Sequence, residues 1–178
     1  SSHGTTAPAT SITGNKITAF RISGAVSGTS TSSSILGIYI GSGLADAISN
    51  QIGSLDGTSS IVDSTTATTS TTEVQGIYNF SVNATTMSNN TVGNIRVVNA
   101  SATTGGASVV GIQANTSSSV TAIANNNVVG SASGPLTVVT PGTSTTSLVR
   151  GMIMTACIAT ATGNTISNLT SNAPNTST

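Results

Sequence analysis

Two short motifs alternate along this chain, and their order constrains the fold more than any other feature. The first is a glycine followed by a large apolar residue, and the second, 13 to 15 residues later, reads Asn, any residue, then Ile or Val. The glycines are Gly37, Gly76, Gly111 and Gly151, and the asparagines that follow them are Asn50, Asn90, Asn126 and Asn164. A fifth asparagine motif begins at Asn15, with no glycine motif before it. This ordered alternation predicts a repeat protein.

The repeat varies in length at defined places. The asparagines at 15, 50, 90, 126 and 164 are separated by 35, 40, 36 and 38 residues. The variation falls in Ser-, Thr- and Gly-rich stretches (28–34, 65–72, 103–108 and 141–147), which predict loops between core segments of constant length. Another apolar residue follows the Ile or Val by three positions in four copies, and Ser131 is the exception: the four are Phe20, Leu55, Ile95 and Leu169. The alternative is that a composition dominated by Ser, Thr, Gly and Asn generates both motifs by chance.

The repeat units are predicted to be β-strands. Their apolar residues are mostly Ile and Val, with Thr dense between them, and β-branched residues favour strands. Ser, Thr, Asn and Gly all compete with helix formation. We therefore predict an all-β solenoid of about four to five coils, each with two or three short strands. The predicted units lie near 11–33, 34–72, 73–107, 108–146 and 147–170, with 1–10 as a tail or inter-subunit segment and 171–178 as a second tail.

The recurring asparagine has a physical explanation in a solenoid. Asn tolerates the left-handed backbone conformation that a sharp corner requires. Its amide also carries both donors and an acceptor, so Asn residues stacked at successive corners can bond to one another. The Ile or Val after it would point inward and stack on its equivalent. The alternative is that these residues are simple turn formers without a ladder.

The asparagine corners at 15, 50, 90, 126 and 164 and the Gly-Ile strands resemble right-handed parallel β-helix proteins. Residues 163–171 (GNTISNLTS) are similar to repeats of large secreted or surface-attached bacterial proteins. The resemblance covers nearly the whole chain and implies a stacked-coil fold and an extracellular or cell-surface location. A repeat near 37 residues is longer than the usual coil of that family. The resemblance therefore requires either bulging Ser/Thr loops or an unusually long coil.

Composition excludes several functions. The chain has four Lys and Arg residues, four Asp and Glu residues and a net charge of zero. A basic footprint for nucleic acid or for an anionic membrane surface cannot be built from so few cations. No window approaches the roughly 18 apolar residues of a membrane helix. One cysteine, Cys157, permits no internal disulfide and is predicted to be a packing residue.

Catalytic chemistry is not expected. Glycoside hydrolysis needs two carboxylates about 5 to 10 Å apart, and the sequence offers only Asp46, Asp56, Asp63 and Glu73. These four are scattered and are best explained as solvated loop positions or as N-terminal ends of strands. The single histidine, His3, lies near the start of the chain, so a Ser-His triad is not expected either. We expect no catalytic residue, no cofactor and no metal site. A β-helix enzyme, or a non-catalytic part of a polysaccharide-active protein, remains an alternative.

Two sets of residues, a tyrosine pair and the Asn-x-Ser/Thr sequons, have both a structural and a functional interpretation. Tyr39 and Tyr78 occupy equivalent places in successive repeats, so we expect them to stack on an outer face, where a carbohydrate platform is the functional alternative. Seven Asn-x-Ser/Thr sequons are candidate glycosylation sites, although this composition produces several by chance: Asn79, Asn83, Asn89, Asn99, Asn115, Asn168 and Asn175.

The terminal repeats carry no obvious caps, and an open solenoid end is an unpaired β edge. We therefore expect a non-catalytic extracellular structural protein, a subunit or segment of a self-associating surface fibre or adhesin stalk, whose partner is itself, head to tail. The alternatives are that the chain is an excerpt of a longer array, or that it is a carbohydrate- or surface-binding module with glycans as partners. Ice binding is less favoured, because the Thr runs fall in loops of unequal length.

Overall fold

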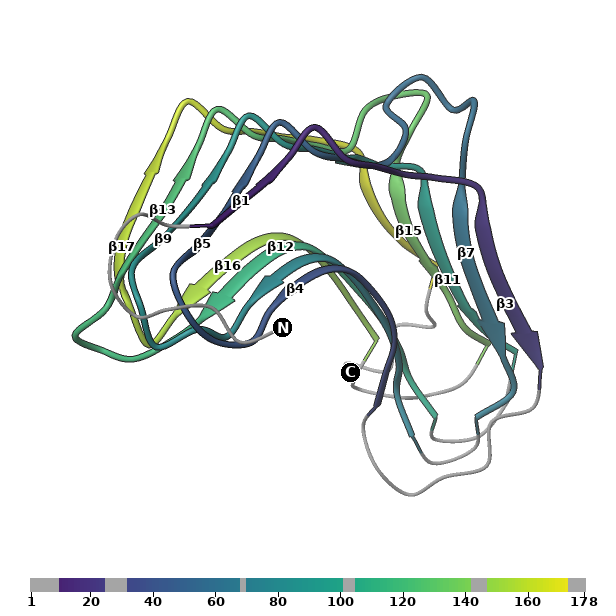
Figure 1. The fold of residues 1–178 in the computed structure, drawn as a ribbon. Coiled ribbons are helices and arrows are strands. Elements are labelled where there is room, and N and C mark those ends of the chain that lie inside the picture. Colours follow the sequence, from purple (N-terminus) through teal and green to yellow (C-terminus); the bar gives the residue numbers. More distant parts are fainter. Residues whose placement is uncertain (1–9, 25–31, 68–69, 101–104, 142–146, 173–178) are drawn as a thin grey trace.

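The computed structural model describes residues 10–24, 32–67, 70–100, 105–141 and 147–172, and these form an all-β solenoid. Its strands stack in four parallel sheets, three with five strands and one with four in the described residues (Figure 1). The predicted all-β class and parallel β-solenoid are confirmed. Each complete coil has four short strands, whereas the sequence predicts two or three.

The coils follow one another in chain order. Coil 1 contains β1 (Thr10–Thr13), β2 (Lys16–Ile17) and β3 (Phe20–Gly24). Coil 2 contains β4 (Ser32–Ile40), β5 (Ala45–Ile48), β6 (Gln51–Gly53) and β7 (Ile61–Thr65). Coil 3 contains β8 (Thr72–Asn79), β9 (Thr85–Ser88), β10 (Thr91–Gly93) and β11 (Ile95–Asn99). Coil 4 contains β12 (Ala107–Asn115), β13 (Thr121–Asn125), β14 (Val128–Val129) and β15 (Leu136–Val139). Coil 5 contains β16 (Leu148–Thr155), β17 (Ile158–Thr162), β18 (Thr165–Ile166) and β19 (Leu169–Asn172).

Corresponding strands of successive coils pair to make the sheets. Sheet A is β1-β5-β9-β13-β17, sheet B is β2-β6-β10-β14-β18, sheet C is β3-β7-β11-β15-β19, and sheet D is β4-β8-β12-β16. Because neighbouring strands are parallel and in register, equivalent residues form rows along the solenoid. The expected inward stacking of the Ile or Val after each asparagine is seen in sheet B, where the row is Ile17, Ile52, Val92, Val129 and Ile166.

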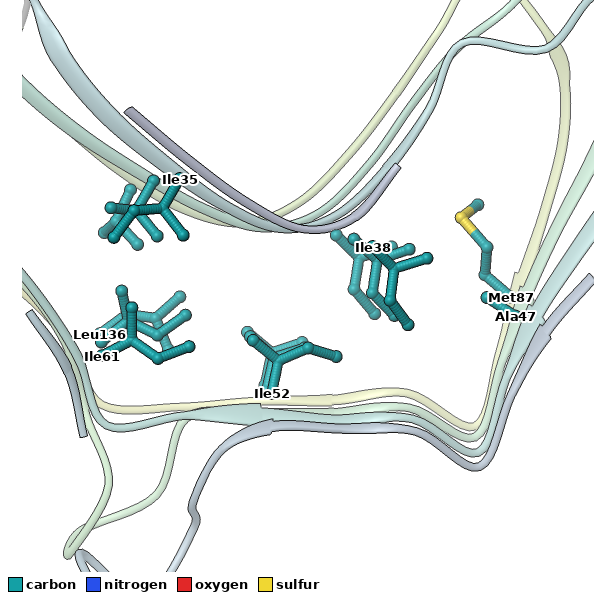
Figure 2. Close-up of a cluster of buried hydrophobic side chains, with 14 of the residues drawn as sticks. Ile35, Ile38, Ala47, Ile52, Ile61, Met87 and Leu136 are labelled. Carbon is teal, nitrogen blue, oxygen red and sulfur yellow. The ribbon is translucent and has the colours of Figure 1, made fainter. Parts of the chain in front are cut away.

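The repeated glycines form a row at which sheet D approaches sheet B. A Cβ on Gly111 would lie 2.5 Å from the carbonyl oxygen of Gly151 and 2.5 Å from Cγ1 of Val129. Equivalent contacts face Gly37 and Gly76, and Gly151 faces Ile166. Figure 2 shows the ribbon bending toward Ile52 between the inward side chains of Ile35 and Ile38. Only glycine leaves room for this approach.

Because two loops are inserted before strands of sheet C, the apolar residue three positions after the Ile or Val does not mark the sheet C row in every coil. The sheet C residues in register with Phe20 and Ile95 are Ile61 and Leu136, whereas Leu55 belongs to a loop before β7. The loops 54–60 of coil 2 and 130–135 of coil 4 meet across coil 3, where the Ser131 hydroxyl donates to the Leu55 carbonyl. Gly93 lies beneath them, since a Cβ there would come within 2.9 Å of both loops.

Candidate functional site

A continuous Asn ladder runs along the corner between sheets A and B. In coil 3, Oδ1 of Asn90 accepts the backbone N–H of Asn50 at 2.9 Å and its Nδ2–H at 3.0 Å. Nδ2 of Asn90 donates to the Ala47 carbonyl at 2.9 Å and to Oδ1 of Asn127 at 3.0 Å. Both amide protons and both acceptor positions are therefore used. The same pattern links the five rungs, which are Asn15, Asn50, Asn90, Asn127 and Asn164.

The fourth rung corrects the sequence assignment. Asn127 is fully buried and bonded in the ladder, whereas Asn126 is exposed and precedes it with a φ of 54°. Spacings between rungs are consequently 35, 40, 37 and 37 residues. The reason is that strand side chains alternate between faces, so Val129, not Val128, faces the core. The prediction of ladder corners at Asn15, Asn50, Asn90 and Asn164 fits this geometry.

The residue before each rung makes the corner itself. Gly14, Ser49, Asn89, Asn126 and Gly163 all have positive φ, from 54° to 68°. The left-handed conformation thus falls one position before the rung, on a residue outside the predicted motif in every coil except the fourth, where it falls on the predicted corner Asn126. The rungs hold the corner by hydrogen bonds, and the preceding residues supply the turn.

The ladder is polar along the solenoid axis. Each rung donates its backbone N–H and one Nδ2–H toward the next coil, and donates its second Nδ2–H back to a carbonyl of the coil before. No donor among the described residues reaches Oδ1 of Asn15, and no described acceptor faces the backbone N–H of Asn164. The first coil therefore ends in an acceptor and the last coil ends in donors.

The terminal coils also leave inward rows uncovered. Ile166 is 46% exposed, although Ile52, Val92 and Val129 in the same row are fully buried. Phe20 and Leu169 are 48% and 38% exposed, whereas Ile61, Ile95 and Leu136 between them are fully buried. Both end faces of the described solenoid thus present core side chains and unpaired strand edges.

The acidic residues lie in different sheets or loops of the described chain. Asp46 lies in sheet A and accepts the Thr86 N–H at 2.7 Å. Asp56 lies in the 54–60 loop, and hydrogen bonds from the Thr58 side chain and backbone lower the pKa of that carboxyl. Glu73 lies in sheet D. Among the described residues no three His, Cys, Asp or Glu side chains are grouped to hold a metal.

Asp63 departs from the expected solvated position. It is fully buried in the inward row of sheet C, between Ile22 and Val97. No local pattern indicates this burial, because Asp63 follows Ile61 and Val62 in an otherwise ordinary strand pattern. Cys157 is half-buried and packs against the core, and burial raises the pKa of its thiol.

The predicted tyrosine stack is present on the outer face of sheet D. The ring centroids of Tyr39 and Tyr78 are 5.6 Å apart, and Phe80 extends the cluster at 6.0 Å from Tyr78. Tyr39 is 51% exposed and Phe80 46% exposed. Phe80 was missed by the sequence reasoning, although it lies two residues after Tyr78 and alternate strand residues share a face.

The sequons divide by burial. Asn79 and Asn99 are fully buried and donate to Thr85 and to backbone carbonyls, so the folded chain has no room for a glycan at either position. Asn83 and Asn115 are half-buried, and Asn89 and Asn168 are exposed. His3 and Asn175 lie outside the described residues.

These features define a parallel β-solenoid with an internal Asn ladder and uncovered terminal coils. No protein-family model matches the chain, and neither the curated proteins nor the solved structures contain a match. The described residues include no helix long and apolar enough to span a membrane.

Proposed function

We propose that this chain is a non-catalytic structural protein, a subunit or segment of a self-associating fibre or adhesin stalk outside the cell or on its surface. The observation that carries the proposal is the exposure of core rows at both ends of the described solenoid. Ile166, Leu169 and Phe20 occupy rows whose central members are fully buried. Coils stacked on these faces would continue the rows.

The energetics favour a weak contact between two copies. Fully burying a large aliphatic or aromatic side chain contributes about 1.5–3 kcal/mol, so covering three half-exposed side chains contributes roughly 3 kcal/mol. Association costs about 4–15 kcal/mol, and the edge hydrogen bonds of sheets A, B and C must supply the difference. We therefore expect assembly at high protein concentration.

The scarcity of reactive groups supports a structural role. The four carboxylates occupy different sheets or loops, and the amides of the five ladder asparagines are bonded within the ladder. A shallow depression of about 250 Å³ beside the 54–60 loop is lined by Gln51, Leu55, Asp56 and Thr91, with a single carboxylate. General acid–base chemistry on a polysaccharide would need a second one.

Sedimentation velocity and negative-stain microscopy test the proposal on the purified chain. We expect linear assemblies that grow with concentration. Leu169→Glu should abolish them, because it places a charge in an inward row, whereas Thr170→Glu, one residue later and facing outward, should leave them intact. Circular dichroism checks that both variants keep their β structure. Dispersed monomers of the unsubstituted chain at high concentration would refute self-association.

The exposed aromatic cluster favours a second candidate function, binding of glycans. Aromatic rings provide apolar faces on which sugar rings pack, and the Tyr39 and Tyr78 hydroxyls add polar contacts. Binding to a panel of soluble polysaccharides, measured for the unsubstituted chain and for Tyr39→Ala with Phe80→Ala, tests this candidate. Equal retention of every polysaccharide by both proteins would exclude the cluster as the site.

A further inference from the structure

The polarity of the Asn ladder specifies how two copies would meet, and this inference rests on the self-association proposed above. Within the chain, each rung donates two hydrogen bonds to Oδ1 of the next rung, and the next rung returns one to a carbonyl of the coil before. That carbonyl lies three residues before the rung of the preceding coil. The acceptors for Asn50, Asn90, Asn127 and Asn164 are, in turn, the carbonyls of Ile12, Ala47, Met87 and Ala124. One rule therefore describes all four internal junctions.

The two ends of the ladder are complementary under this rule. The backbone N–H and the outward Nδ2–H of Asn164 stand as donors at one end, and Oδ1 of Asn15 stands as the acceptor at the other. Nδ2 of Asn15 donates one proton to Oδ1 of Asn50 at 3.0 Å, and its second proton faces the Thr13 carbonyl at 3.4 Å, where internal rungs bond a carbonyl of the preceding coil at 2.7–2.9 Å. The carbonyl three residues before Asn164 belongs to Ala161.

We infer that copies stack head to tail in the register of the ladder, with Asn164 of one copy donating to Oδ1 of Asn15 in the next. Nδ2 of that Asn15 then donates to the Ala161 carbonyl, and the Lys16 N–H bonds the Asn164 carbonyl, as Gln51 bonds Asn15 within the chain. The stack is polar, because acceptor ends do not pair with acceptor ends. The partner is a second copy of this chain in one orientation.

The same register aligns apolar residues in two other inward rows. Extending the sheet pairings by one step places Ile166 on Ile17 and Leu169 on Phe20 of the next copy, and it places the small side chain of Ser171 on Ile22. On the outer face it places Thr165 beside Lys16 and Thr170 beside Arg21. Like charges opposite each other would destabilise a strand pair, and none occurs here.

Disulfide crosslinking reads this register directly. Thr170 and Arg21 point outward from sheet C, and parallel neighbours about 4.8 Å apart lie within the roughly 4.4–6.8 Å Cα separation that a disulfide accepts. We therefore pair Thr170→Cys with Arg21→Cys in a chain that also carries Cys157→Ala. The matched control pairs Thr170→Cys with Ser23→Cys, two residues along the same face, where the separation would be about 8 Å. Neither pair can close within one copy, since coils 1 and 5 are about 19 Å apart.

The expected result is a ladder of covalent oligomers on a non-reducing gel for the Thr170–Arg21 pair after incubation with oxidised glutathione. At least tenfold less product is expected for the Thr170–Ser23 control at the same concentration. Assemblies that sediment normally but crosslink through the control pair, or through neither pair, would overturn the register while leaving self-association intact. Monomers alone, with no crosslinking, would overturn both.

Discussion

Replacing a single ladder asparagine by alanine is expected to destabilise the fold far more than the same change one residue earlier. Asn127 is fully buried and its side chain makes four hydrogen bonds, to Asn90 twice, to Met87 and to Asn164. Asn127→Ala removes, in the interior, the acceptor of the Asn90 N–H, the acceptor of one Asn90 Nδ2–H and the side-chain donor to the Met87 carbonyl. Each costs about 1–3 kcal/mol, and we expect about 4 kcal/mol in total, below the sum because neighbours relax.

The adjacent Asn126 provides the matched control. It is exposed and has a φ of 54°, so Asn126→Ala loses mainly the tolerance of Asn for the left-handed conformation, about 1–2 kcal/mol. Asn164→Ala should be intermediate, because its rung is half-buried and has one neighbouring rung. This third variant keeps the comparison usable if Asn127→Ala fails to fold.

The assay is urea unfolding followed by circular dichroism, with the free energy of unfolding taken from the midpoint and an unchanged slope. The expected order of destabilisation is Asn127, then Asn164, then Asn126. If Asn126→Ala costs as much as Asn127→Ala, or if Asn127→Ala costs less than about 1 kcal/mol, the ladder does not stabilise the fold as argued.

Three further predictions follow from the same geometry. Gly111→Ala places a Cβ 2.5 Å from the Gly151 carbonyl oxygen and should lower the free energy of unfolding by about 3 kcal/mol or more, measured by urea unfolding; a loss below about 1 kcal/mol would show that sheet D can move away. Thr58→Val removes the side-chain hydrogen bond that is the largest cause of the lowered pKa of Asp56, so this pKa should rise toward 3.8 in an NMR titration. The charged carboxylate stabilises the fold until the pH falls through its folded pKa, so in the variant this stabilisation should be lost at a higher pH. An unchanged pKa would refute the assignment. Burial raises the pKa of Cys157, so its reaction with a thiol reagent at pH 8 should be slower in the folded chain than in urea, and equal rates would contradict the packing.

Much of the fold was predictable because in-register stacking repeats the same kind of residue at the same place. Ile35, Val74, Val109 and Val149 were visible as aliphatic residues two positions before each glycine, and they do lie in one row. The glycine row was equally visible, although the close approach of sheets D and B that requires it was not. The asparagine motif indicated corners with hydrogen-bonding capacity, which the ladder has.

Ambiguity arose where the local sequence satisfied the motif twice. Asn126-x-Val128 and Asn127-x-Val129 both match, and a shift of one residue exchanges the inward and outward faces. The inserted loop of coil 2 posed a similar problem, since Leu55 and Ile61 are both apolar and only the strand pairing shows that Ile61 continues the row. The buried Asp63 and the four strands per coil depend on packing across coils, which a local pattern does not contain.

The low charge of the chain follows from the register. Equivalent outward residues lie about 4.8 Å apart in a parallel sheet, so charged residues of one sign at successive positions would repel within the Debye length of about 8–10 Å. In the described rows, charged residues of one sign are separated by uncharged ones. One outward row of sheet C reads, in coil order, Arg21, Val62, Arg96, Thr137 and Thr170. Stacking a second copy in the ladder register puts its Arg21 after Thr170. Two threonines then separate it from Arg96, so the junction brings no pair of like charges closer than the chain already tolerates.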